Sequence, residues 1–472
     1  MRGRRTWPAL LALALAASAS SVGATGRVPA APKLAAEVVP YDEARVEEMS
    51  VATFDGSGRP LPPTTWRVVS GTGNDRENYL AATKDGMLLD FGGEWIRFST
   101  DEGRTWSQVL PAEELRPWYG YEGTVAVAPG GDVVAFAQDY PPGLALTFKY
   151  EGSSKKWFYS TSKMHAPALD RPALGVLPGP FTVGPLEVPY VSVIRGGFFL
   201  SKTPWYYSFD GLNYTVPNSR AADAATGSSA EPLQIEPWDE LDWVQPHELN
   251  AITPYGRGRA LAEKPSLGAF DLDATAPRTI LDPDTLRWAA YSFPGSGPEQ
   301  SQVTDLASRG RTLVDSTGLL HHTSMTDTAI VYKTSSDGGA TWVTRTFPLL
   351  PGYSVTNGGA GRESAKSFKV NGAAATAAVV VHAIKQMEPL VTQDLVYRFS
   401  LRDGLPHLKR VYALGAGDFG CRPGGLATTT PPDGNCDFPS VVLLPGGRIA
   451  ASFTDAAHPE PSVAVQLQAG RK

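Results

Sequence analysis

Residues 99–106 read Ser-Thr-Asp-Glu-Gly-Arg-Thr-Trp, and residues 335–342 read Ser-Ser-Asp-Gly-Gly-Ala-Thr-Trp. Both stretches share Ser, Asp, Gly, Thr and Trp in the same order and at the same spacing. A weaker copy, Ser-Phe-Asp-Gly-Leu-Asn-Tyr, occupies residues 208–214. Self-similar motifs within one chain are typical of proteins built from many copies of one small structural unit.

The residue types in this motif predict a tight turn between two β-strands. Short Asp and Ser side chains hydrogen-bond nearby backbone groups, and Gly adopts a positive φ without strain. The terminal Trp is suited to fill the space between neighbouring sheets. We therefore interpret the motif residues as structural: Ser99, Asp101, Gly103, Thr105 and Trp106 in the first copy, Ser208 and Asp210 in the weaker copy, and Ser335, Asp337, Gly339, Thr341 and Trp342 in the last.

Similar but degenerate turns lie between the clear copies, at 150–157, 282–288 and 402–411. Strand-like runs around Gly-rich turns precede them, as in 79–83, 87–91 and 95–99 of the first unit. Four strands per unit is the size of a propeller blade. The sequence thus predicts an all-β protein, a β-propeller of four-stranded blades.

Seven blades are favoured, with six as the alternative. The last unit begins near 439 and reaches the end of the sequence before a fourth strand, whereas 48–54 has no partner of its own. An N-terminal strand that completes the last blade would close the ring and remove an open sheet edge. The expected organisation is a signal peptide over 1–24, a linker over 25–47 and the propeller over 48–472.

The first residues predict export. An Arg-rich start is followed by an apolar run at 10–17 and by small-residue cleavage sites, which is typical of a secretory signal peptide. The apolar run is too short to span a membrane. We expect a secreted protein, periplasmic or extracellular, in which Cys421 and Cys436 form a disulfide, because an oxidising compartment favours one.

Composition narrows the classes of function. Hydrophobic residues make up 42%, enough for a core, while 48 Gly and 40 Pro indicate many turns. The net charge is only -6 and no basic cluster follows the leader, which argues against nucleic-acid or membrane partners. We expect a monomer, with no cofactor and no metal, since Asp433, Asn435 and Asp437 are followed by Phe438 where a calcium loop needs Gly.

The repeated motif resembles the Asp-box, or BNR repeat, of sialidases and related propellers. That resemblance implies that the boxes lie away from the substrate face. It extends upstream in the first blade, where Arg76 stands nine residues before Asp85, as an arginine does in sialidases. The resemblance makes Arg76 a candidate for carboxylate binding, which suits a planar guanidinium, although Glu77 and Asn78 replace the family's Ile-Pro.

Other positions match the family only in part. Glu248 corresponds to the glutamate that activates the tyrosine nucleophile, Tyr353 resembles that nucleophile, and Lys264 stands where the family has an arginine. Lysine is a point charge and does not reproduce the guanidinium fork. The acid/base loop of the first blade is missing, because only three residues separate Phe91 from Trp95. A glycosidase normally needs that acid.

The segment 238–248 is the richest in acids and aromatics, and Asp239, Glu240 and Trp243 suit either sugar binding or an ordinary loop. The favoured hypothesis is a sialidase-like propeller that engages a glycan or another extracellular ligand on the face where the fourth strand leads into the next blade, without efficient sialidase activity. An active glycoside hydrolase and a protein-interaction scaffold are the alternatives.

Overall fold

The computed structural model describes residues 33–70, 79–91, 96–118, 123–138, 144–163, 173–183, 186–195, 205–208, 210–214, 252–254, 260–262, 278–282, 287–291, 310–315, 319–336, 341–355, 368–372, 374–385, 391–417, 440–453 and 462–467. Most of these residues are in β-strands. The helical segments among them are short 3-10 turns, η1 (Glu113–Trp118), η2 (Pro129–Gly131) and η5 (Pro445–Gly447). Within this part of the chain no helix has the length and apolarity to cross a membrane.

The strands form separate antiparallel sheets in chain order. The first holds β5 (Tyr79–Ala82), β6 (Leu88–Phe91), β7 (Ile96–Ser99), β8 (Ser107–Leu110) and, outermost, β2 (Glu37–Pro40). The second holds β9 (Gly123–Val127), β10 (Val133–Gln138), β11 (Leu144–Glu151), β12 (Lys156–Lys163) and, outermost, β1 (Leu34–Ala35). The third holds β13 (Ala173–Val183), β14 (Leu186–Arg195) and β15 (Trp205–Ser208).

Two further sheets have four strands each among the described residues. One is β16 (Ile252–Pro254), β17 (Ala260–Ala262), β18 (Arg278–Asp282) and β19 (Arg287–Tyr291). The other is β20 (Gly310–Val314), β21 (Leu320–Met325), β22 (Ala329–Ser335) and β23 (Val343–Pro348).

The last sheet is the largest and combines two sets of strands. One set is β24 (Tyr353–Val355) and β25 (Phe368–Asn371), which both pair with β26 (Thr376–Lys385), followed by β27 (Val391–Arg402) and β28 (Leu405–Gly417). The other is β29 (Val441–Leu443), β30 (Ile449–Phe453), β31 (Ser462–Gln466) and β4 (Pro60–Ser70). The strand β3 (Arg45–Asp55) pairs with both β28 and β4 and joins the two sets.

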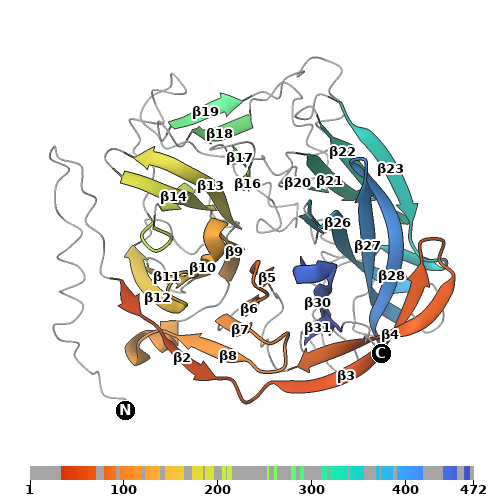
Figure 1. The fold of residues 1–472 in the computed structure, drawn as a ribbon, viewed down its shortest axis with the longest axis horizontal. Coiled ribbons are helices and arrows are strands. Elements are labelled where there is room, and N and C mark those ends of the chain that lie inside the picture. The colour runs from red at the N-terminus through yellow and green to blue at the C-terminus, as the bar shows by residue number, and fades with distance from the viewer. Residues whose placement is uncertain are drawn as a thin grey trace, which may run out of the picture.

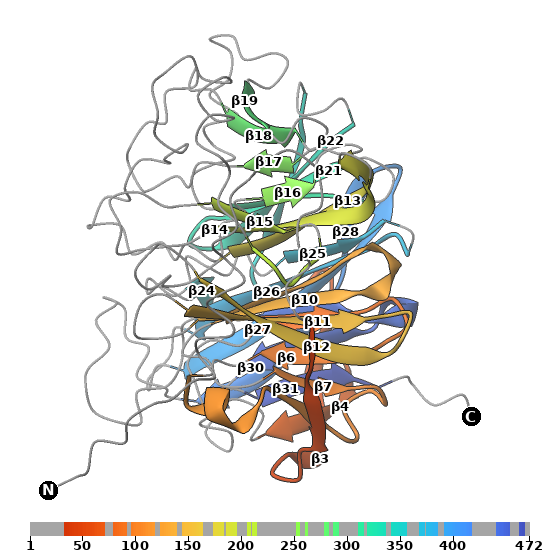
Figure 2. The same cartoon turned by 90° about the vertical axis from the view of Figure 1, so that its left-hand side faces the viewer.

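Figure 1 shows the sheets arranged in a ring around a central axis, in the order in which they occur along the chain. In the side view of Figure 2, the strands β13 to β15 lie directly above β10 to β12. The prediction of an all-β protein with several antiparallel sheets is confirmed.

The apolar core lies between neighbouring sheets. Leu89 and Phe91 of the first sheet pack with Phe148 of the second in one buried cluster. Tyr332 contacts Phe399 of the next sheet edge to face, with ring centroids 5.4 Å apart. Because both faces of each inner strand are covered, β26 reads as an almost continuous apolar run, as expected for strands buried on both sides.

The N-terminal segment runs along the outer edge of the ring. The strand β1 pairs with β12 and β2 pairs with β8, so the part of the expected linker 25–47 that the structure describes contains paired strands. In Figure 1 the segment passes below the β5–β8 sheet and continues into β3 and β4. Pairing with four different sheet edges protects each of them.

The strand that completes the last set is β4 and not the expected segment 48–54. The pairs Val463 with Val69 and Gln466 with Trp66 place β4 directly beside β31, and β3 lies one strand further out. The reason is burial: β4 ends in the buried run 66–69, whereas residues 45–48 of β3 are exposed. The expectation of an N-terminal strand in this place was correct, but its position was wrong.

The turn after β7 is held by its own side chains. Asp101 Oδ1 accepts the backbone N–H groups of Arg104 (3.0 Å) and Thr105 (2.9 Å), and its Oδ2 accepts the Thr105 hydroxyl (2.7 Å). Ser99 Oγ donates to Asp101 Oδ1 and accepts the N–H of Gly103 at 2.8 Å. The residue Gly103 has a φ of 80°, which a side chain would make costly.

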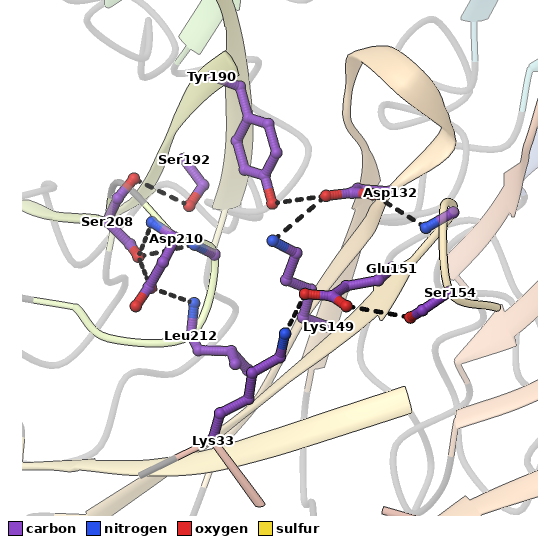
Figure 3. Close-up of polar contacts among 12 residues, drawn as sticks. Lys33, Asp132, Lys149, Glu151, Ser154, Tyr190, Ser192, Ser208, Asp210 and Leu212 are labelled. Atoms are coloured by element: carbon purple, nitrogen blue, oxygen red, sulfur yellow. Dashed lines mark hydrogen bonds and ion pairs between the residues drawn. The ribbon is translucent and has the colours of Figure 1, made fainter. Parts of the chain in front are cut away.

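The turn after β15 repeats this arrangement, as Figure 3 shows. Asp210 Oδ1 accepts the N–H groups of Leu212 and Asn213, both at 2.8 Å, and Ser208 Oγ accepts the N–H of Gly211 at 2.9 Å. Two turns that lie far apart in sequence thus use the same Ser and Asp acceptors, although the second turn is one residue shorter. Of the third copy, Asp337 and Gly339 lie outside the described residues, and Trp342 is half-buried with its ring 6.4 Å from that of His322.

The Asp101 turn should make stability depend on acid. Burial acts to raise the pKa of Asp101, but the hydrogen bonds from Thr105, Ser99 and Arg104 outweigh it and lower the pKa below its usual value. A carboxyl whose pKa is lower in the folded state stabilises the protein above its unfolded pKa, and this contribution disappears as the pH falls through the folded pKa. We expect the stability advantage of the native protein over Asp101→Asn to shrink between about pH 5 and pH 3.

Urea unfolding of both proteins across that range measures the effect. A difference in the free energy of unfolding that stays constant with pH would contradict the assignment.

Candidate functional site

Most of the residues that the sequence singled out for ligand binding lie outside the described residues: Arg76, Asp239, Glu240, Trp243, Glu248 and Lys264. The same holds for Cys421 and Cys436, whose disulfide stays a prediction. The candidate that the structure does describe is Tyr353. Its surroundings therefore define the site.

Tyr353 begins β24, directly after the connection from β23. It is paired with Lys385 at the end of β26, and Lys385 Nζ lies 5.8 Å from the centre of the tyrosine ring. The Tyr353 hydroxyl donates to Oε1 of Gln393, which is near the start of β27. The strand ends thus gather a half-buried aromatic ring, an amide and an ammonium group where one sheet leads into the next.

The protonation of Tyr353 is opposite to that of an activated nucleophile. Burial raises the pKa of its hydroxyl above the ordinary value. A tyrosine nucleophile works as a phenolate or needs an adjacent base, whereas the partner of this hydroxyl is a neutral amide. As placed, the Tyr353 hydroxyl is a neutral hydrogen-bonding group.

A second pair of polar residues lies on the other face of the same strands. His382 Nδ1 is 2.8 Å from Asp394 Oδ1, and the two residues stand directly opposite each other on β26 and β27. A carboxylate at Nδ1 favours the tautomer that carries its proton there. Both side chains are buried, so they link the strands inside the sheet rather than meeting a ligand.

This pair is not among the site residues predicted from the sequence. A signal existed, because His382 interrupts the apolar run of residues 377–384 and Asp394 precedes the apolar residues Leu395 and Val396. Single polar residues within apolar strands are usually satisfied by a cross-strand partner.

A buried network of three polar side chains lies near the other ends of the strands, away from Tyr353. His321 Nε2 is 3.0 Å from Asp315 Oδ2, and its Nδ1 is 3.0 Å from the Tyr332 hydroxyl. Burial lowers the pKa of His321, although Asp315 acts to raise it. The described residues contain no group that could hold a metal ion. This hydrogen-bonded network is a structural element between sheets.

Comparisons with known proteins give limited information. No protein-family model matches the chain, and a search of curated proteins found no match. Among solved structures, the NanB sialidase from Streptococcus pneumoniae is similar at 11% identity and a TM-score of 0.34, over 84% of this chain and 70% of that one. The WD40 domain of SCAP from fission yeast has 6% identity and a TM-score of 0.36, over 91% and 94% of the two chains.

The polysaccharide lyase Uly1 is similar at 11% identity and a TM-score of 0.32, over 96% of this chain and 94% of that one. At such low scores these similarities assign no activity. The chain is an all-β protein of antiparallel sheets arranged in a ring, and the solved structures similar to it include a sialidase and a polysaccharide lyase.

Proposed function

We propose that this chain is a secreted, seven-bladed propeller with Asp-box turns that engages a glycan or another extracellular ligand and lacks efficient sialidase activity. The ring in Figure 1 and the repeated four-stranded sheets support the propeller. The matching turns at Asp101 and Asp210 support the Asp-box assignment. Export rests on the first residues of the sequence.

The observation that carries the functional proposal is the hydrogen bonding and the raised pKa of the Tyr353 hydroxyl. Its hydroxyl is hydrogen-bonded to Gln393 and has a raised pKa, which suits binding better than nucleophilic attack. A half-exposed aromatic ring beside an amide and an ammonium group can stack on a sugar face and hydrogen-bond its hydroxyls. The face is the one on which the fourth strand of one sheet connects to the next sheet, away from the Asp turns.

Binding to a panel of immobilised glycans, sialylated and neutral, tests the proposal. We expect Tyr353→Ala and Lys385→Gln to weaken any glycan signal, since both residues belong to the site. Lys155→Gln is the matched control, because Lys155 is an exposed lysine in the turn between β11 and β12. Equal weakening by all three variants would point to general charge effects and contradict the site.

Hydrolysis should be inefficient. Loss of general acid/base catalysis alone costs about 10²- to 10⁴-fold in rate, and here the acid/base loop is missing from the sequence while Tyr353 is held neutral. We expect the purified protein to release sialic acid from an aryl sialoside well below about 1 per second. Turnover at or above that rate, abolished by Glu248→Gln and by Tyr353→Phe, would contradict the proposal and support an active glycoside hydrolase.

A further inference from the structure

The turns between the third and fourth strands of the sheets, here called outer turns, fill the grooves between sheets. The outer turn after β7 packs on the β29–β31 and β4 set: Arg67 Nη1 donates to the Glu102 carbonyl at 2.7 Å, and Gly103 faces Val465. The outer turn between β27 and β28 packs on the preceding β20–β23 sheet, where Gly404 faces Leu319. Each of these turns therefore closes the groove toward the preceding sheet.

The outer turn after β15 packs between the second and third sheets in the same way, and Figure 3 shows Lys149, Asp132 and Tyr190 beside it. The Leu212 carbonyl accepts the hydroxyl of Thr147 at 2.6 Å. The cation in this groove is neutralised, because Lys149 Nζ lies 3.2 Å from Asp132 Oδ2, which also accepts the Tyr190 hydroxyl at 3.3 Å. Polar groups in the filled groove have partners from the protein itself.

Among the described residues, the set formed by β29, β30, β31 and β4 has no outer turn. Its third strand, β31, ends at Gln466, and its fourth strand, β4, begins at Pro60 in another part of the chain. Closure by the N-terminal segment thus removes the turn that would pack on the preceding set, β25 to β28. The groove between these two sets contains a cavity of about 820 Å³.

The cavity lies near the outer-turn ends of the strands, remote from Tyr353. Thr376 at its wall and Lys385 at the Tyr353 site are the two ends of β26. Nine residues at about 3.3 Å each separate them by roughly 30 Å. The charged lining residues are Glu48, Arg398, Lys409, Arg410 and Arg448, and the uncharged ones with hydrogen-bonding side chains are Thr64, Thr65, Thr376, Ser400 and Gln466.

Positive charge gathers on one wall of the cavity because of the local register. Arg398 of β27 stands directly opposite Arg410 of β28, and a β-bulge inserts Lys409 beside them. A bulge places an extra residue against a single partner and re-aims its side chain. Like charges directly opposite each other in a sheet are destabilising, so this wall favours an anion between the strands.

The cavity has little negative charge of its own. Glu48 is the single carboxylate in its lining, and Arg448 already pairs with Glu102 at 2.7 Å. Among the described residues, Arg398, Lys409 and Arg410 form no ion pair. In the filled groove, by contrast, Asp132 supplies a negative charge that pairs with Lys149.

Hydrogen-bonding groups in the lining are also unpartnered. Ser400 Oγ and Arg448 Nε are buried and have no partner within the described part of the chain. Gln466, only 7% exposed, has its Oε1 unpartnered while its Nε2 donates to the Tyr412 hydroxyl at 3.0 Å. Buried polar groups are nearly always satisfied. The Ser400 hydroxyl and the Arg448 guanidinium N–H are donors that suit an anion, whereas Gln466 Oε1 is an acceptor and does not favour one.

We propose that this cavity binds a small ligand that carries tetrahedral oxyanions, as sulfate or phosphate esters. Guanidinium groups bind such oxyanions in a bidentate manner, and three unpaired cations match more than one negative charge. Ligand sites of small molecules occupy about 300 to 1,000 Å³, and the cavity falls in that range. The site is separate from the proposed glycan face and does not depend on it.

Calorimetric titration at constant ionic strength tests the proposal, with inorganic sulfate, inorganic phosphate, glucose 6-sulfate, glucose 6-phosphate and glucose as probes. We expect saturable binding of at least one oxyanion probe and none of glucose. A preference between the two esters identifies the source of the oxyanion. Binding by none of the four anions would overturn the proposal.

Two variants separate the cavity from general surface charge. We expect the double variant Arg398→Gln with Arg410→Gln to lose about tenfold or more in affinity. Arg402→Gln is the matched control, because Arg402 is an exposed arginine near the same end of β27 that does not line the cavity, and it should retain affinity. An equal loss in the control would overturn the proposal.

Stability without ligand gives an independent readout. Because Arg398 and Arg410 repel each other, we expect Arg398→Gln to raise the melting temperature at low ionic strength and to reduce the rise that the bound anion causes in the native protein. A merely structural arginine would lower the melting temperature when replaced and leave the anion-dependent rise in place.

Discussion

Replacing Trp66 with alanine is expected to lower the free energy of unfolding by about 3 to 5 kcal/mol, the range for deleting a large buried aromatic side chain. Trp66 lies on β4, is 0% exposed and contacts Tyr412 edge to face at 5.2 Å between ring centroids. Its indole N–H donates to Thr64 Oγ1 at 2.9 Å. The loss of this ring leaves a cavity where the N-terminal strand joins the last set of strands.

Urea unfolding followed by circular dichroism measures this effect, and Val46→Ala is its control. Val46 lies on the neighbouring β3 but is 43% exposed, so its truncation should cost less than about 1 kcal/mol. Similar costs for both variants would mean that the buried face of β4 does not hold the N-terminal segment in place.

Replacing Trp106 with alanine should have a comparable effect, about 3 to 5 kcal/mol. Trp106 is 4% exposed and packs in a buried cluster with Val463 and Val465 of β31. Its indole N–H donates to the Gly103 carbonyl at 3.3 Å, so the ring joins the outer turn to the preceding set of strands. Its removal affects the turn and the inter-sheet core together.

Trp342 provides the comparison, since it stands at the same motif position but is only half-buried. We expect Trp342→Ala to cost clearly less than Trp106→Ala in the same urea experiment, because the cost of truncation grows with the buried volume that is lost. Equal costs would show that the two motif copies are packed alike and would contradict the difference in burial.

The charged cavity results from the way in which the ring of sheets is closed. A fourth strand supplied from the N-terminal segment pairs with β31, but within the described part of the chain it also leaves one groove without an outer turn. Arg398, Arg410 and Ser400 line that groove. The same feature that completes the sheet therefore creates the site that we propose for an oxyanion ligand.

The sequence by itself determined the local structure. The turn at Asp101 needs only the side chains and backbone groups of residues 99–106, so its hydrogen bonds follow from residue types at fixed spacing. The all-β class follows in the same way, from short apolar runs separated by Gly-rich turns. These interactions join residues that are near neighbours along the chain.

Only the tertiary structure decided which distant segments meet. The sequence indicated that an N-terminal strand completes the last set, but the choice of β4 over residues 48–54 depends on how deeply 66–69 is buried against β31. The pairs Arg398 with Arg410 and His382 with Asp394 likewise depend on strand register, and a bulge at Lys409 changes that register by one residue. Register arises from the fit of whole sheets, because a shift of one residue moves every side chain to the opposite face.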